Sequence, residues 1–160
     1  MRPEPNVSPL DISDAGEILT LQRAAYVTEA RAHNDLGLPP LRQTLPELIT
    51  ELRSPHVLAH GIRDDSARLV AAVRTHLDCP VARIGRLTVA PDRQGRGLGS
   101  RLLRTLESVL PAGVRELHLF TGEHSLRNLA LYERLGYREF RRSPAGDYEL
   151  IHLRKPLRRT

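Results

Sequence analysis

The chain has 160 residues, 40% of them hydrophobic and 27% charged, and 24 Lys and Arg against 19 Asp and Glu give a formal net charge of +5 at pH 7. This length and composition predict one globular domain over residues 1–160 with a buried core. The single cysteine, Cys79, excludes an intrachain disulfide, and no apolar stretch is long enough to cross a membrane. We therefore expect a cytoplasmic protein whose basic balance suits an anionic ligand.

The N-terminal part of the chain carries one strand signal followed by helix and loop signals. Asp14 and Glu17 have the spacing of a capping box, and Thr44 with Glu47 forms a better one. The predicted elements are a strand over Val7–Ile12, a helix ending near His33, a loop over Asn34–Gln43 and a helix over Leu45–Leu52.

The central and C-terminal parts are predicted to hold most of the strands. The run Asp64-Asp65-Ser66 favours a hairpin turn, and Gly136 suits the C-terminus of a helix. The expected strands are His56–Arg63, Ala67–Leu77, Val81–Val89, Val114–Thr121, Tyr137–Arg142 and Tyr148–Leu153, with a helix over Ser125–Leu135 and a loose tail over residues 156–160.

The segment from Ile84 to Leu103, IGRLTVAPDRQGRGLGSRLL, reads as a strand, a tight loop and a helix. Pro91 ends the strand because it has no N–H for a sheet hydrogen bond. Gly95, Gly97 and Gly99 then allow a sharp turn and a close approach of the backbone to another group. The apolar period changes after the loop to that of a helix, with one apolar face made by Leu98, Leu102, Leu103, Leu106, Val109 and Leu110.

A glycine loop that leads into a helix N-terminus favours anion binding. The first backbone N–H groups of a helix lack internal partners, and the helix dipole attracts negative charge there. Arg93, Arg96 and Arg101 add positive charge around the loop. The segment therefore predicts a phosphate or pyrophosphate cradle, and the alternative is a strand–helix turn without a ligand.

The loop does not match the two common phosphate-binding motifs. It lacks the lysine of a Walker A motif, and its glycines do not have the spacing of a dinucleotide fingerprint. It resembles the acetyl-CoA motif of the GNAT superfamily of N-acetyltransferases, Arg/Gln-x-x-Gly-x-Gly/Ala, through Gln94, Gly97 and Gly99. The preceding run Leu87–Pro91, LTVAP, resembles the central strand of the family.

The order of predicted elements, β-α-α-β-β-β-α-β-α-β-β, also resembles the GNAT fold. The resemblance implies an α/β (α+β) class with a mixed, mostly antiparallel sheet of about seven strands flanked by about four helices. In that fold the fourth and fifth strands are parallel and splay apart, and the pantetheine arm of CoA enters between them.

A second motif lies in Thr121–Tyr137, TGEHSLRNLALYERLGY, which resembles the family segment N-x-x-A/L-x-x-x-Y-x-x-x-G-F/Y in its second half. Asn128 and Tyr132 are four residues apart, closer than the family pattern, and four apart on a helix they share a face. The resemblance implies that Asn128 binds the CoA arm and that Tyr132 is the general acid that protonates the leaving thiolate.

The resemblance further implies acetyl-CoA as co-substrate and no metal. The backbone N–H of Val89 is the expected oxyanion donor, and the pantetheine arm is expected to pair with this strand as an added strand would. The CoA-binding residues implied are Leu87, Thr88, Val89, Gln94, Gly95, Arg96, Gly97, Leu98, Gly99, Ser100, Asn128 and Tyr132.

The general base is not evident in the sequence. The strand over Val81–Leu87 carries no carboxylate, whereas the histone-modifying branch keeps a glutamate on the equivalent strand. Glu123 is one candidate base, with His76 and His118 as others, and water or an already neutral amine are alternatives.

The acceptor is expected to bind near the end of the first helix and the last hairpin. Candidate residues are Tyr26, Glu29, Asn34 and Tyr148. Their mixture of apolar surface and few charges favours a small amine or an amino-acid-like acceptor over a highly cationic one.

These observations favour an enzyme that acetylates the primary amine of a small molecule. The alternatives are a protein N-terminal or lysine acetyltransferase and a non-catalytic CoA-binding module. Nucleic acid is an unlikely partner because aromatic residues make up only 4% of the chain and tryptophan is absent. A homodimer is compatible with the sequence.

Overall fold

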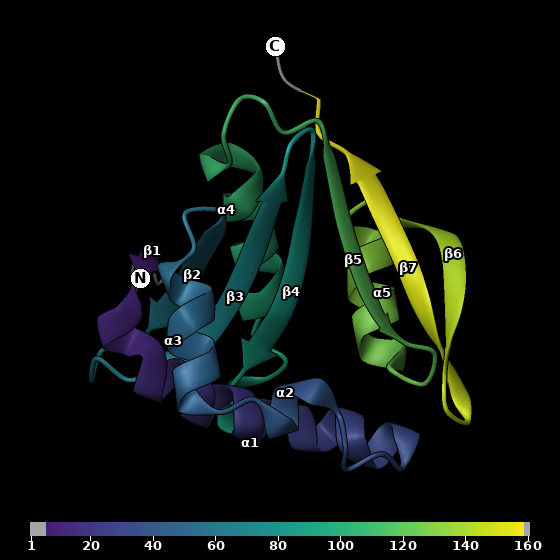
Figure 1. Ribbon diagram of the computed structural model, residues 1–160, viewed down its shortest axis with the longest axis horizontal. Helices are drawn as coiled ribbons and strands as arrows, with labels where there is room; N and C mark the ends of the chain where they lie inside the picture. Colours follow the sequence, from purple (N-terminus) through teal and green to yellow (C-terminus); the bar gives the residue numbers. More distant parts are fainter. Residues whose placement is uncertain (1–5, 159–160) are drawn as a thin grey trace.

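A seven-stranded sheet with the order β1-β2-β3-β4-β5-β7-β6 runs through the computed structural model, which describes residues 6–158 (Figure 1). Neighbouring strands pair antiparallel except β4 and β5, which are parallel. The strands are β1 (Val7–Leu10), β2 (Val57–Arg63), β3 (Leu69–Asp78), β4 (Val81–Val89), β5 (Glu116–Gly122), β6 (Arg138–Ala145) and β7 (Tyr148–Pro156).

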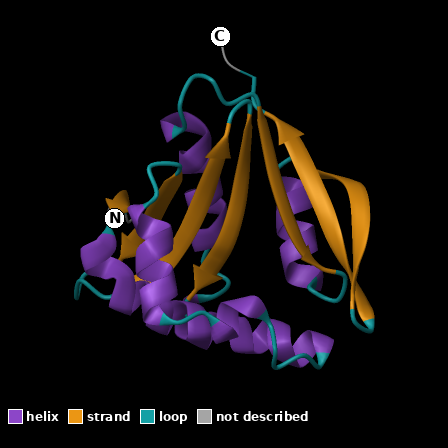
Figure 2. Cartoon of the chain, viewed as in Figure 1, coloured by secondary structure: helices purple, strands orange, loops and turns teal. Residues whose placement is uncertain are grey.

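Helices cover both faces of the sheet, so the predicted mixed architecture is confirmed (Figure 2). The helices α1, α2 and α3 lie on one face, and α4 and α5 lie on the other (Figure 1). There are five rather than about four, because the two prolines of the expected loop start a short helix. The helices are α1 (Ala15–His33), α2 (Pro39–Arg42), α3 (Leu45–Arg53), α4 (Leu98–Val109) and α5 (Leu126–Arg134).

The two predicted helix caps have different outcomes. Thr44 and Glu47 form the expected capping box at the start of α3. The predicted capping by Asp14 is wrong, because a short 3₁₀ turn precedes α1 and is capped by Asp11 instead. The Asp14 carboxylate pairs with Arg63 at 2.7 Å, so this ion pair replaces the cap.

The apolar face of α4 packs on the sheet and forms much of the core. Leu102, Leu103 and Leu106 are at most 2% exposed, as the helical period predicts. Val109, expected on the same face, is instead 48% exposed and lines a surface hollow beside β1 and β2. The core contact at the end of the helix is made by Leu110, which is buried.

The sheet opens between β4 and β5. Only three residue pairs join these strands, from Val81 with Glu116 to Arg83 with His118. Beyond them the strands separate toward α1, which crosses the open end of the sheet (Figure 1). The predicted splay of the two parallel strands is therefore present.

The C-terminal strand is longer than predicted. Pro156 belongs to β7, and Leu157 is buried with its N–H donating to the Arg115 carbonyl at 2.8 Å. A loose tail is therefore wrong for these two residues. Residues 159 and 160 of the expected tail lie outside the described part of the chain.

Candidate active site

The glycine loop places uncapped backbone amides at the start of α4. Gly97 is the N-cap residue with φ 78°, and Gly95 has φ 77°, both in the left-handed region that favours glycine. No side chain caps this helix, and a Cβ at Gly97 would meet no atom within 4 Å. The first amides of α4 are therefore available to an anion, and the space above Gly97 suits one.

The charge around the loop differs from the sequence expectation. Arg93 pairs with Asp64 and Asp92, both at 2.9 Å, so it adds no net positive charge and that expectation is wrong. A hydrogen bond from Arg68 holds the pKa of Asp92 well below its usual range. Arg127 of α5 instead reaches the loop, with Nη1 at 3.4 Å from Oε1 of Gln94.

The main chain of β4 faces the splay next to this loop. The Ala90 N–H donates to the Val70 carbonyl at 2.8 Å, and Val89 pairs with Ala71 one position earlier. Hydrogen-bonded and non-hydrogen-bonded pairs alternate between antiparallel strands, so the N–H of Val89 points away from β3 and toward β5. The pairing of β4 with β5 ends at Arg83, so β5 does not pair with β4 at Val89.

A β-bulge interrupts β4 in the middle of the splay. Ala72 pairs with Thr88 and Arg74 with Gly85, which leaves Arg86 and Leu87 opposite a single residue of β3. Arg86 has φ 54°, an uncommon conformation for a non-glycine residue. A bulge next to a site re-aims side chains, and here it turns Arg86 toward α1.

Glu29 connects α1 to the opposite half of the sheet. Its carboxylate accepts a hydrogen bond from Ser125 Oγ and another from Asn128 Nδ2 at 3.1 Å. Asn128 also lies 3.5 Å from the Thr121 hydroxyl. Asn128, which the sequence assigns to the CoA arm, therefore already has protein partners for its amide nitrogen.

Tyr132, the predicted acid, is buried beside this carboxylate. Burial raises its pKa well above the usual value, and Tyr26, Glu29 and Tyr137 raise it further. Its ring lies 6.0 Å from that of Tyr137. The phenol therefore stays protonated at neutral pH, as a proton donor requires.

The C-terminal end of α1 is held against the loop after β5. The His33 ring accepts a hydrogen bond from the His124 N–H at 3.0 Å, and a Cβ at Gly122 would lie 2.1 Å from its Nε2. Tyr148 packs on the same ring at 4.5 Å and donates to Asp35 at 2.7 Å. Burial and that hydrogen bond raise the pKa of Tyr148 to about 12.

The three candidate bases have partners of their own. Glu123 accepts the backbone N–H of Glu149 at 2.9 Å, which ties the carboxylate to β7. His76 lies 3.3 Å from Glu51, and His118 lies 2.8 Å from Glu116. The carboxylate that acts electrostatically on Tyr132 is Glu29, which the sequence assigns to the acceptor site.

The acceptor residues are only partly brought together. Tyr26 and Glu29 lie on one face of α1 near Tyr132, whereas Asn34 is an exposed C-cap residue with φ 49°. Sequence reasoning missed Arg86, which interacts electrostatically with Tyr26, and Ser125, which holds Glu29. A charged residue inside a central strand is the signal that could have identified Arg86.

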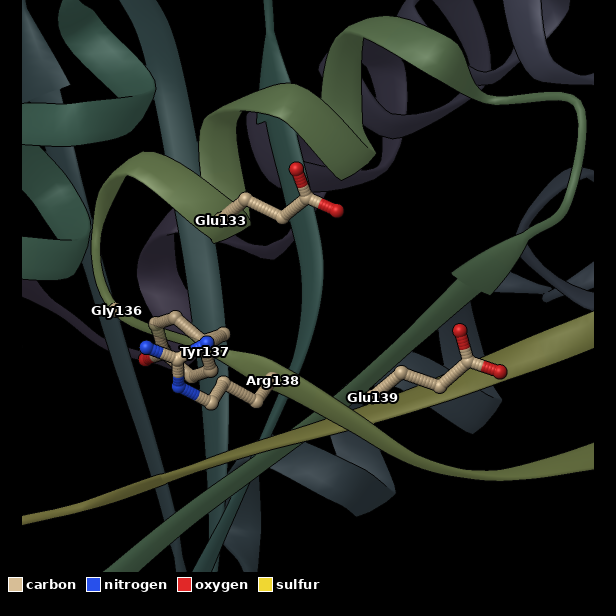
Figure 3. A pocket seen from close by; sticks show the side chains of 5 residues that line it. All are labelled: Glu133, Gly136, Tyr137, Arg138 and Glu139. Atoms are coloured by element: carbon tan, nitrogen blue, oxygen red, sulfur yellow. The ribbon is translucent and has the colours of Figure 1, made fainter.

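Surface hollows elsewhere do not coincide with this site. One of about 550 Å³ is lined by Glu133, Gly136, Tyr137, Arg138 and Glu139, between the end of α5 and the start of β6 (Figure 3). It contains none of the predicted catalytic or CoA-binding residues.

Within residues 6–158 no group of three His, Cys, Asp or Glu side chains could hold a metal ion. None of the helices described there is long and apolar enough to span a membrane.

An uncapped helix N-terminus lies beside two splayed parallel strands in this fold, as the resemblance to the GNAT superfamily implies. The model of the acetyltransferase (GNAT) family matches residues 20–137. The chain therefore belongs to the GNAT family of acetyltransferases, and the resemblance seen in the sequence is confirmed.

Solved structures share this fold over nearly the whole chain. The ribosomal-protein-S18-alanine N-acetyltransferase from Escherichia coli has a TM-score of 0.80 at 21% identity, covering 98% of this chain and 96% of that one. PaiA N-acetyltransferase from Thermoplasma acidophilum, solved with coenzyme A, has a TM-score of 0.78 at 17% identity, and the match covers 94% of this chain and 98% of that one. Spermidine N-acetyltransferase from Vibrio cholerae, solved with CoA and spermine, has a TM-score of 0.73 at 15% identity, and the match covers 95% of each chain.

Proposed function

We propose that this protein transfers the acetyl group of acetyl-CoA to the primary amine of a small-molecule acceptor while both are bound. The observation that carries the proposal is the uncapped start of α4, with Gly97 at φ 78°, directly beside the splayed main chain of β4. The solved relatives with CoA bound share this arrangement of elements at the level of the fold.

The residues around the loop fit a phosphate-bearing co-substrate. The amides from Gly95 to Ser100 would hold its pyrophosphate, because they begin a helix that no side chain caps. Arg127 and the exposed Arg96 would add positive charge there. The main chain of Leu87–Val89 would pair with the pantetheine arm. Asn128, whose amide donates to Glu29 in this structure, would donate to the pantetheine arm instead.

The chemistry needs one bond formed, one broken and one proton moved. Acetyl-CoA supplies a thioester; the amine nitrogen bonds to the acetyl carbon and the carbon–sulfur bond breaks. The proton that leaves the nitrogen passes to water, and water reprotonates Tyr132 after that phenol has given its proton to the sulfur. The N–H of Val89 would stabilise negative charge on the acetyl oxygen. Tyr132 would protonate the departing sulfur, since burial keeps its phenol in the acid form.

Titration of acetyl-CoA into the purified chain by calorimetry, followed by thiol release with a panel of amines, tests this proposal. Tight binding with thiol release for one class of amine is the expected result. Binding without release by any amine would leave a CoA-binding module. Failure to bind acetyl-CoA would show that the glycine loop has been misinterpreted.

Protein N-terminal acetylation is the second candidate. The fold similarity to the S18-alanine enzyme extends over 98% of this chain, so short peptides with a free α-amine belong in the same panel. Release with peptides but not with small amines would favour this candidate.

A further inference from the structure

Arg86 differs from the other arginines of the central strands in lacking a carboxylate partner. Arg63 pairs with Asp14 and Glu17, Arg74 with Glu51 and Arg83 with Asp78. No ion pair among residues 6–158 includes Arg86, and its Nε is buried without a hydrogen-bond partner. A buried donor left unsatisfied is costly and calls for an explanation.

Arg86 lies on the acceptor side of the sheet. A Cβ at Gly99 of α4 would lie 3.8 Å from Leu87, so Leu87 faces α4. Arg86 precedes Leu87 in the bulge and interacts with the Tyr26 hydroxyl of α1, on the opposite face. The co-substrate phosphates are expected at the start of α4, so Arg86 is not placed to bind them.

Glu29, whose charge is opposite to that of Arg86, lies on the same face of α1 as Tyr26. Glu29 follows Tyr26 by three residues, a spacing that makes the two neighbours on a helix. Both Arg86 and Glu29 act electrostatically on the Tyr26 hydroxyl, and Tyr26 and Glu29 act on Tyr132. Arg74 also acts on Tyr26, but Glu51 neutralises it, so Arg86 and Glu29 are the cation and the anion beside this tyrosine that do not pair with each other.

We propose that the acceptor is an amine that also carries a carboxylate, as a free amino acid does, with the carboxylate bound by Arg86 and the ammonium group facing Glu29. Guanidinium groups bind carboxylates through two parallel N–H donors, and no carboxylate of the described residues occupies the Arg86 guanidinium. This inference rests on the proposed function and names the substrate class of the same site.

The test compares ligands that differ only in the carboxylate. The 20 common L-amino acids, their primary amides and short peptides are titrated by calorimetry into the protein saturated with CoA, and acetylation is measured for each with acetyl-CoA. We expect at least one amino acid to bind and react about 10- to 100-fold better than its own amide, the range for one charge-assisted contact. Equal affinity for acids and amides, or binding of peptides alone, would overturn the inference.

Variants of β4 assign the effect to Arg86. Arg86→Asn, a residue that tolerates the left-handed backbone, should raise KM for the amino acid about 10- to 100-fold more than it raises KM for the corresponding amide. Arg83→Gln is the matched control, because Arg83 is exposed on the same strand and pairs only with Asp78. An unchanged preference for acid over amide in Arg86→Asn would refute the assignment.

Failure of this inference can be told apart from failure of the proposed function. If acetyl-CoA binds and simple amines release thiol as fast as amino acids, the acetyltransferase proposal holds and the carboxylate proposal fails. If amino acids bind the CoA-loaded protein more tightly than their amides but no thiol is released, the carboxylate site holds and acetyl transfer fails.

Discussion

At the scale of single residues, the two buried tyrosines beside the splay have different surroundings. Tyr132 lies near Glu29 and Tyr26, at the centre of the proposed site. The Tyr137 hydroxyl is buried without a hydrogen-bond partner, and Lys155 lies over its ring. The same substitution in each therefore separates a chemical role from a packing role.

We expect Tyr132→Phe to keep acetyl-CoA affinity within about twofold and to lower kcat by about 10- to 100-fold. This is less than a typical general acid contributes, because a thiolate is a fair leaving group. Tyr137→Phe should leave kcat unchanged and raise stability by up to about 1 kcal/mol, since it removes an unsatisfied hydroxyl. Calorimetry, steady-state kinetics and urea unfolding measure these effects; full turnover in Tyr132→Phe would remove the acid role.

The glycine loop provides a second residue-level prediction. Gly97→Glu should abolish detectable acetyl-CoA binding, because it places a carboxylate at the anion-binding end of α4. Gly146→Glu is the matched control: Gly146 has φ 66° in the β6–β7 turn and open space around it, so the backbone strain is the same. If both variants lost affinity equally, strain rather than the cradle would explain the loss.

At the scale of elements, a buried polar network docks the N-terminal helices on the sheet. Gln22 of α1 donates to the Pro40 carbonyl of α2 and to Gln43, at 2.8 and 3.0 Å. Gln43 in turn bonds Glu51 of α3 and Arg74 of β3. Arg74 is 2% exposed and Glu51 neutralises it at 2.5 Å, so the network positions α1 and with it Tyr26 and Glu29.

This network makes stability depend on pH in the acid range. Burial raises the pKa of Glu51, but hydrogen bonds from His76, Gln43 and Arg74 and the Arg74 charge lower it to about 2. Because the folded pKa is below the unfolded one of about 4.5, this stability is complete above pH 4.5 and is lost as pH falls toward 2. Urea unfolding from pH 6 to pH 2 should show this loss.

Glu51→Gln should weaken this pH dependence and cost about 3 kcal/mol at pH 7, because it leaves the buried Arg74 without its counter-charge. The exposed pair of Arg83 and Asp78 supplies the control, so Asp78→Asn should change stability by less than about 1 kcal/mol. If the two variants lowered the free energy of unfolding equally, burial of the Arg74–Glu51 pair would not explain its contribution to stability.

At the scale of the whole molecule, α1 joins the two halves of the sheet across the splay. Gly122→Ala should disturb this junction, because its Cβ would meet the His33 ring at 2.1 to 2.8 Å. We expect a loss of about 1–3 kcal/mol in thermal or urea unfolding. His33→Ala in the same chain should recover part of that loss, whereas Gly16→Ala, with open space in α1, should be neutral or stabilising. Additive losses in the double variant would contradict the contact.

Local patterns in the sequence were enough for the seven strands, for four of the five helices described and for the glycine loop, but not for α2. Periodicity, turn residues and the Thr44–Glu47 cap depend on neighbours in the chain, and the structure confirms them. Arg93 was misjudged because its partner Asp64 is 29 residues away. The charge of Arg86 inside a central strand was a local signal, but the orientation of its side chain depends on a bulge in β4 that the sequence did not predict.

The brevity of the β4–β5 pairing also governs how the molecule folds and opens. Three residue pairs join the two half-sheets through the main chain. The side-chain links from α1 to His124 and Ser125, and from Asp35 just after α1 to Tyr148, span 91 to 113 positions. Contacts so distant in sequence form slowly and late. In the native state the amides of His124 and Ser125 should exchange with deuterium before those of β3, and a ligand bridging both halves should slow that exchange.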